Sequence, residues 1–95
     1  MKKIIPVVLA QNIDEFKKNL ELFLSFSKEI QIDIADGYFV ENRTVEPVEI
    51  DKLPDSGTFE MHLMVSDPLD YLDNCKRIGA KRIVFHDEVE ENTEN

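Results

Sequence analysis

The chain has 95 residues, which suits one small domain, expected to span residues 1–95. Hydrophobic residues make up 42% and charged residues 33%, a composition typical of globular rather than disordered proteins. The net charge of −9 argues against nucleic acid and anionic membrane surfaces as partners, because both would repel the chain. The single cysteine, Cys75, excludes an intrachain disulfide and favours a cytoplasmic setting. No apolar run approaches the ~20 residues that span a bilayer.

The first expected element is a strand over about residues 4–10. Its nearly continuous apolar sequence is typical of a strand buried on both faces. A helix should follow, with Asn12 as N-cap and with Asp14 and Glu15 in the first turn, where the helix dipole favours acids. It should end near residues 25–27. Its expected buried stripe consists of Ile13, Phe16, Leu20, Phe23 and Leu24.

A second strand is predicted over residues 29–35, where isoleucine alternates with other residues. The Asp-Gly pair at 36–37 ends it with turn chemistry. Residues 38–57 form the least regular stretch, with a short helix expected around 48–53. The third strand is expected over residues 58–65.

A second clear helix should begin at Ser66 or Asp67, with Pro68 in its first position, where the missing N–H costs nothing. Gly79 should end it. A fourth strand is predicted over about residues 81–87, and an acidic, polar tail follows. The expected stripe of this helix consists of Leu69, Leu72, Cys75, Lys76 and Gly79.

This order of elements predicts an α/β fold. Strands that alternate with helices are parallel and joined by right-handed crossovers. Both an open doubly wound sheet and a barrel satisfy this pattern.

In a barrel, one face of each strand meets the helices and the other points inward. Burying unpaired polar groups costs roughly 2–7 kcal/mol, so inward polar groups must pair with each other, with water or with a metal. Barrel enzymes place such groups near the carboxyl ends of strands. The inward set predicted here is Gln31 and Asp33 on the second strand, Glu60, His62 and Met64 on the third, and Val84, His86 and Glu88 on the fourth.

A single histidine in a strand is more often a satisfied core residue than a ligand. Asp33 is harder to explain in that way, because the interior of a parallel strand rarely holds an acid without a reason. Asp33 and His62 together therefore form the candidate site, and His86 is a weaker candidate. Cys75 is expected only to pack.

Two motifs resemble a known family. Residues 30–40, with the sequence IQIDIADGYFV, resemble the second strand and following loop of ribulose-phosphate 3-epimerases. Residues 61–68, MHLMVSDP, with Tyr71 after them, resemble the third strand and the helix that follows. Residues 5–10 are similar to the opening strand of the family and residues 83–88 to its fourth strand.

The resemblance implies the N-terminal half of a (β/α)₈ TIM barrel. It implies an isomerase that interconverts D-ribulose 5-phosphate and D-xylulose 5-phosphate, in which two carboxylates transfer protons on opposite faces and a divalent metal stabilises an enediolate. By position, Asp33 resembles the catalytic acid/base that also ligates the metal, His62 resembles a metal ligand, and Met64 resembles a methionine that covers the substrate. The metal would be zinc, iron, manganese or cobalt.

Three residues depart from the family pattern. Gln31 stands where the family has a metal-binding histidine, and an amide oxygen is a weaker ligand for a transition metal. Val7 replaces a substrate-contacting serine, and Ala35 replaces a methionine. His86 is a further substrate-contact candidate of lower weight. The second catalytic aspartate and the phosphate-binding loops of the family lie on later strands, in a barrel of about 200–250 residues.

Three functions therefore remain open from the sequence. The chain is part of a sugar-phosphate epimerase, including the hexulose-phosphate type, or a non-catalytic homologue that binds a sugar phosphate or a partner. Alternatively, it is a half-barrel that assembles with itself. In each case we expect a homo-oligomer or a C-terminal half as partner, because four strands leave two open sheet edges.

Overall fold

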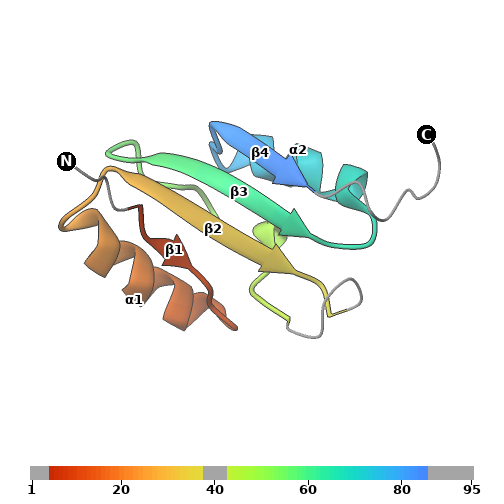
Figure 1. The fold of residues 1–95 in the computed structure, drawn as a ribbon, viewed down its shortest axis with the longest axis horizontal. Helices are drawn as coiled ribbons and strands as arrows, with labels where there is room; N and C mark the ends of the chain where they lie inside the picture. Colours follow the sequence, from red (N-terminus) through yellow and green to blue (C-terminus); the bar gives the residue numbers. More distant parts are fainter. Residues whose placement is uncertain (1–4, 38–42, 86–95) are drawn as a thin grey trace.

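The computed structural model describes residues 5–37 and 43–85. Strands and helices alternate along the chain, with two short 3₁₀ turns between them (Figure 1). The elements are β1 (Val7–Val8), α1 (Ile13–Leu24), β2 (Glu29–Ala35), η1 (Pro47–Glu49), β3 (Thr58–Met64), η2 (Pro68–Tyr71), α2 (Leu72–Arg77) and β4 (Arg82–Phe85).

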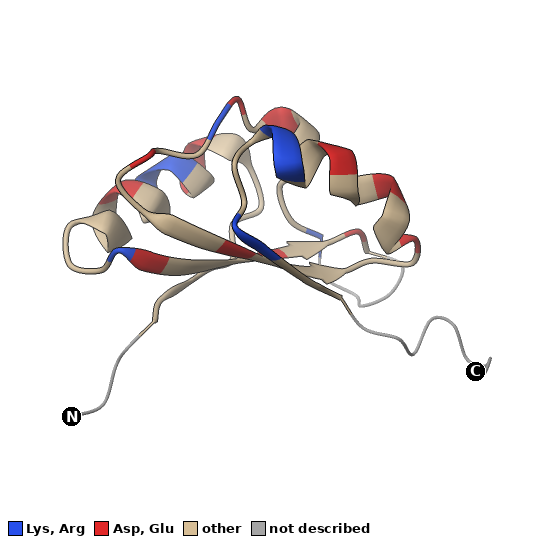
Figure 2. Ribbon diagram, turned by 90° about the horizontal axis from the view of Figure 1, so that it is seen from above, with Lys and Arg blue, Asp and Glu red and all other residues tan. Residues whose placement is uncertain are grey.

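The four strands form one parallel sheet in the order β1-β2-β3-β4, which confirms the predicted α/β alternation. Both α-helices lie on the same side of this sheet, and its opposite side is uncovered by any described element (Figure 2). We call this opposite side the open face. A curved parallel sheet with helices on one side only is the arrangement of half a TIM barrel.

The core lies between the sheet and the helices. The alternating isoleucines of β2 are all buried against this layer, as predicted, and so is the alternating set of β3. Gly57, the residue before β3, packs closely against α1. A Cβ atom at this position would lie only 2.8 Å from Leu24 Cδ2. The buried strand residues are Val8, Ile30, Ile32, Ile34, Ala35, Phe59, Met61 and Leu63.

The prediction of a first strand buried on both faces is wrong. Within the described residues β1 covers only Val7–Val8, and the burial alternates. Val8 is fully buried, whereas Val7 is 41% exposed and Leu9 is 51% exposed. Their side chains have no cover because no described element packs on the open face. Phe85 of β4 is in register with the buried Leu63, on the helix side of the sheet, but it is 40% exposed because β4 is the last strand of the described sheet.

Helix α1 begins as the sequence predicted. Asn12 is its N-cap, and the Asn12 side-chain oxygen accepts a hydrogen bond of 2.8 Å from the backbone N–H of Glu15. The Glu15 carboxylate in turn accepts a 2.9 Å bond from the backbone N–H of Gln11. Phe16 and Leu20 are buried, so the predicted stripe faces the sheet. None of the described helices is long and apolar enough to cross a membrane.

The second predicted helix divides into two parts. Pro68 opens the 3₁₀ turn η2, and the α-helix begins only at Leu72. Cys75 is buried as expected, but Leu69 is 69% exposed and does not belong to the packed stripe, because the tighter 3₁₀ turn rotates it outward. Lys76 and Gly79, which were also expected in this stripe, are exposed. Gly79 ends the helix with a φ of +98°, and Ala80 N–H donates to Cys75 O, which completes the glycine termination that the sequence predicted.

The predicted helix over residues 48–53 is also wrong. The chain forms one 3₁₀ turn at Pro47–Glu49, and Ile50 is already extended. Leu53 precedes Pro54, whose ring disfavours helical geometry in the residue before it. Ile50 and Leu53 are nevertheless buried, and Leu53 N–H donates to Ile78 O at 2.8 Å.

Arg77 of α2 forms hydrogen bonds with the irregular segment around residues 47–51. Its guanidinium donates to the carbonyl oxygens of Asp51 at 2.9 Å, Ile50 at 2.9 Å and Pro47 at 3.2 Å. The Pro47 carbonyl also accepts a 3.0 Å hydrogen bond from Ile50 N–H, so Arg77 adds a second donor there. At Ile50 and Asp51 the same planar side chain satisfies two further backbone acceptors.

We therefore expect Arg77→Ala to lower the free energy of unfolding by about 1–3 kcal/mol, since hydrogen bonds from a charged donor are lost. Arg77→Lys should recover only part of this loss, because an ammonium group lacks the planar fork. Urea unfolding measures the effect, with Lys76→Ala as the control on the exposed neighbouring residue. Equal effects of Arg77→Ala and Lys76→Ala would contradict this role.

Candidate active site

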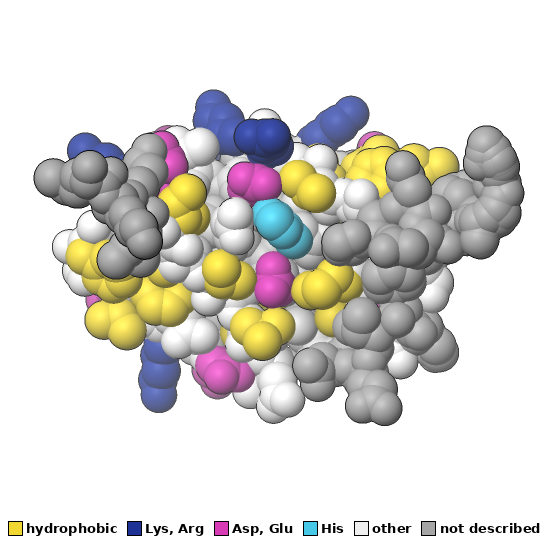
Figure 3. Space-filling model, viewed as in Figure 1, with side chains coloured by type: hydrophobic (Ala, Val, Ile, Leu, Met, Phe, Trp, Pro, Cys, Tyr) yellow, Lys and Arg dark blue, Asp and Glu magenta, His cyan; other side chains and the backbone are white. Residues whose placement is uncertain are grey.

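Asp33 of β2 and His62 of β3 are direct partners in the parallel register and lie on the open face. The next pair toward the amino ends is Gln31 and Glu60. All four side chains are partly buried. In the space-filling view, the histidine lies in the middle of this face with acidic side chains on two sides (Figure 3). The structure thus brings together the two residues singled out from the sequence.

Burial raises the pKa of the Asp33 carboxyl above its ordinary value of 3.8, and the nearby His62 partly opposes this shift. The shift arises because a half-buried carboxylate loses hydration and no described cation pairs with it strongly enough to compensate. A raised pKa makes a carboxylate a stronger base, which suits a group that removes a proton from carbon.

The same shift predicts a pH-dependent stability. A carboxyl whose pKa is raised on folding favours the folded state only while it is protonated, and this contribution is lost as the pH rises through the folded-state pKa. Asp33→Asn should therefore raise the melting temperature near pH 7 and change it less near pH 3. The measurement is thermal unfolding with a chelator present, with Asp55→Asn as an exposed control. A lower melting temperature of Asp33→Asn near pH 7 would count against this assignment.

His62 has a partner that the sequence analysis placed on the inward face but did not assign to the site. Its Nε2 atom lies 2.9 Å from Oε2 of Glu60. The two residues are separated by one position on β3, so both side chains point to the open face. An acid two residues before a candidate histidine in the same strand is the sequence signal that could have identified Glu60.

Two further candidate residues, Met64 and Val7, lie on the open face or at its edge. Met64 is partly buried on the open face, in register with Ala35. Val7 is in register with Gln31 and is 41% exposed at the edge of this face. His86, the weaker candidate, lies outside the described residues, as does residue 88.

Backbone connections fix the carboxyl end of β2 beside the site. The Asp36 carboxylate accepts a 2.9 Å hydrogen bond from Ser66 N–H, which joins the segments that follow β2 and β3. The buried Thr44 hydroxyl accepts a 2.9 Å bond from Ala35 N–H, and Thr44 N–H donates to Ala35 O. The end of the strand that carries Asp33 is therefore held by hydrogen bonds to both the N–H and the C=O group of Ala35.

Two other titratable side chains are unsuited to proton transfer or nucleophilic chemistry. Burial raises the pKa of the Cys75 thiol to about 11, so it remains a packed, protonated group, as expected from the sequence. Burial and the neighbouring Glu46 raise the pKa of Tyr71 to about 12, so its phenol keeps its proton.

The side chains at this site are of the types that bind divalent cations, but the described residues provide too few of them to complete a metal site. Asp33 offers a carboxylate, His62 an imidazole and Gln31 an amide oxygen, which are ligands for zinc, iron, manganese or cobalt. Across residues 5–37 and 43–85, no cluster of three or more His, Cys, Asp or Glu side chains is placed to hold a metal ion. Within the described residues this donor set is therefore incomplete.

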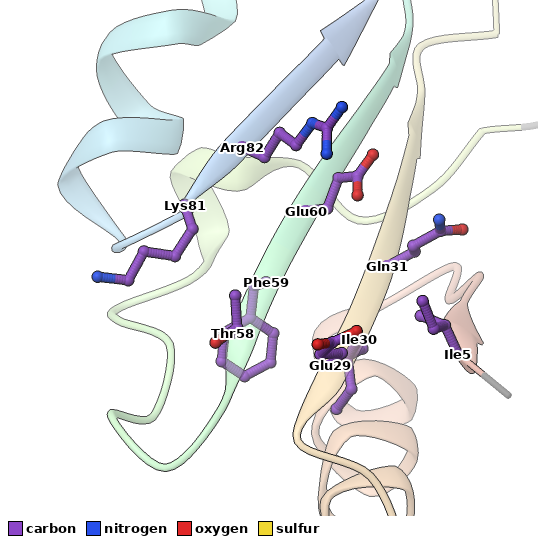
Figure 4. A pocket seen from close by; sticks show the side chains of 9 residues that line it. All are labelled: Ile5, Glu29, Ile30, Gln31, Thr58, Phe59, Glu60, Lys81 and Arg82. Carbon is purple, nitrogen blue, oxygen red and sulfur yellow. The ribbon is translucent and has the colours of Figure 1, made fainter. Parts of the chain in front are cut away.

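A cavity of about 300 Å³ adjoins the candidate site, at the amino ends of β2, β3 and β4 (Figure 4). Glu60, Arg82 and Gln31 contribute to its lining, whereas Asp33 and His62 do not. Active sites of barrels lie at the carboxyl ends of the strands, so we assign this cavity no catalytic role.

Comparison with known proteins identifies the family. The profile of the ribulose-phosphate 3 epimerase family matches residues 3–95. The chain belongs to this family. It is 31% identical over 98 residues to the ribulose-phosphate 3-epimerase of Schizosaccharomyces pombe, which covers 97% of this chain and 43% of that protein.

Two further relatives carry the same name. The ribulose-phosphate 3-epimerase of Chlamydia muridarum is 35% identical over 85 residues, covering 87% of this chain and 33% of that protein. The cytoplasmic isoform of Oryza sativa subsp. japonica is 30% identical over 90 residues, covering 92% of this chain and 40% of that protein. The chain thus spans less than half the length of these curated relatives, and its sheet corresponds to half of the family barrel.

Proposed function

We propose that the protein carrying this chain interconverts D-ribulose 5-phosphate and D-xylulose 5-phosphate. The observation that carries the proposal is the pairing of Asp33 with His62 on the open face of a sheet from the epimerase family. An aspartate with a raised pKa beside an imidazole offers a base and a neighbour able to share the developing charge.

In this reaction Asp33 removes the hydrogen of the carbon next to the keto group. Inversion at that carbon needs a second acid/base on the opposite face of the planar intermediate. In the family this second group is an aspartate on a later strand, so this chain supplies one of the two faces. Asp33 points away from the helices into the open face, where a substrate bound inside a closed barrel would lie.

A divalent cation would be held by Asp33 and His62, with Gln31 as a weaker ligand and further ligands from outside the described residues. When bound, it would stabilise the negative charge that develops on the substrate oxygens. Because Gln31 replaces an imidazole with an amide oxygen, the site should discriminate less among zinc, iron, manganese and cobalt.

Substrate contacts would come from the same face. Met64 covers the sugar on one side, beside Ala35 in the register. Val7 offers only an isopropyl group where the family has a serine, so one substrate hydroxyl loses a hydrogen-bond partner. His86 remains a candidate contact of lower weight.

The open face needs a cover before substrate can be enclosed. Ile5, Val7 and Leu9 on this face are each at least 38% exposed, and β1 and β4 are the two edge strands of the sheet within the described residues. We propose a C-terminal half-barrel, or a second copy of the chain, as this partner. The rice relative is named a cytoplasmic isoform, which supports the same compartment here.

Turnover tests the function directly. The protein that carries this chain, together with its barrel partner, should convert D-ribulose 5-phosphate to D-xylulose 5-phosphate. Chelation should lower this rate and added divalent metal should restore it. Tight binding of the sugar phosphate without conversion would instead support a non-catalytic homologue, an alternative favoured by Val7 at the serine position.

A further inference from the structure

Glu60 and His62 form the shortest side-chain contact between charged or titratable groups that the structure gives for the open face. The distance from His62 Nε2 to Glu60 Oε2 is 2.9 Å, and the two side chains are 28% and 26% exposed. Because one residue separates them on β3, the strand itself fixes their separation. The bond therefore needs little loop ordering.

We propose that Glu60 is a positioning residue for His62. Its carboxylate accepts the Nε2–H hydrogen bond and so leaves Nδ1 as the ring nitrogen available to a divalent cation beside Asp33. The inference rests on the proposed function, because it specifies how one ligand of that site is oriented. A histidine ligand commonly donates its second ring N–H to a carboxylate, which fixes the tautomer and the ring orientation.

The surroundings of Glu60 support this role. Its register partner on β4 is Arg82, and Figure 4 shows the Arg82 guanidinium reaching toward the Glu60 carboxylate. Glu60 thus lies between an imidazole and a guanidinium. An ionised carboxylate only accepts hydrogen bonds, so the proton of the Glu60–His62 bond belongs to Nε2.

The experiment uses the presence of only two histidines in the chain. In a His86→Gln background, His62 gives the only imidazole signals in ¹⁵N NMR. Without metal, at a pH where the ring is neutral, Nε2 should be protonated and Nδ1 bare. On addition of Zn²⁺, the large shift should appear at Nδ1.

Glu60→Leu should weaken zinc binding by about 10–100-fold, the usual effect of removing a partner of a metal ligand, and should allow zinc at either ring nitrogen. Glu60→Gln keeps the length of the side chain, but its amide can both donate and accept a hydrogen bond. Either neutral tautomer of His62 should then be populated, with less risk to folding than in Glu60→Leu. Glu21→Leu on the exposed face of α1 is the matched control and should leave the zinc titration unchanged.

Zinc at Nε2 of His62 in the His86→Gln background with Glu60 intact, no zinc-dependent shift of either nitrogen, or equal zinc affinity of Glu60→Leu and Glu21→Leu would each overturn the proposal. Turnover is measured separately, with His86 intact. Zinc at Nδ1 without epimerase activity would sustain the role of Glu60 and remove the proposed reaction. Epimerase activity with zinc at Nε2 would sustain the proposed reaction and remove the role of Glu60.

Discussion

Asp33→Asn should lower epimerase turnover of the complete protein by about 10²–10⁴-fold, the usual contribution of a positioned acid/base group. The amide cannot take up the substrate proton, and it is a weaker ligand for the cation. Folding should be retained, because the side chain is only partly buried and the amide has nearly the same shape as the carboxyl. The assay follows conversion of D-ribulose 5-phosphate at saturating metal.

The control for this prediction is Asp55→Asn, an exposed aspartate in the turn before β3. It has the same change of charge and should keep full turnover. If Asp33→Asn kept most of the activity, Asp33 would have no catalytic role. A loss shared equally by both variants would point to net charge rather than to the site.

Ile32→Ala should lower the free energy of unfolding by about 2–5 kcal/mol, because it removes fully buried methyl groups and leaves a cavity. Gln31→Ala, one residue earlier on the same strand, should change it by less than about 0.5 kcal/mol, since its side chain lies on the open face. Denaturant unfolding of the two variants compares the two faces of β2 directly.

A domain is typically stable by only about 5–15 kcal/mol, so Ile32→Ala is at risk of unfolding outright. Ile32→Val then provides the second variant, with an expected loss of about 0.5–1.5 kcal/mol. Similar losses from Gln31→Ala and Ile32→Val would contradict the division of the sheet into a packed face and an open face.

This division was predictable because it depends on local alternation. In β2 and β3 every second residue is large and apolar, so sequence period alone sets which side chains meet the helices. The pairing of Asp33 with His62 followed from the same alternation, since both lie on the less apolar face of neighbouring strands. Asn12 and Gly79 were equally predictable, because caps depend on a single residue type.

The errors arose where tertiary cover or turn geometry decides the outcome. An apolar run such as β1 looks the same whether one or both faces are covered, so the exposure of Val7 and Leu9 could not be predicted from it. Leu69 has helical spacing, but a 3₁₀ turn gives it a different direction. Glu60 was placed on the inward face but not assigned to the site, because a strand glutamate has no special meaning until its distance to His62 is known.

Hydrogen exchange of the substrate tests the central assignment most directly. Each epimer is incubated with the complete protein in deuterated water, and incorporation at the carbon next to the keto group is followed by NMR. We expect exchange from both epimers with the unaltered protein, and loss of exchange from at least one epimer with Asp33→Asn. Unchanged exchange from both epimers in that variant would contradict the assignment of Asp33 as a base.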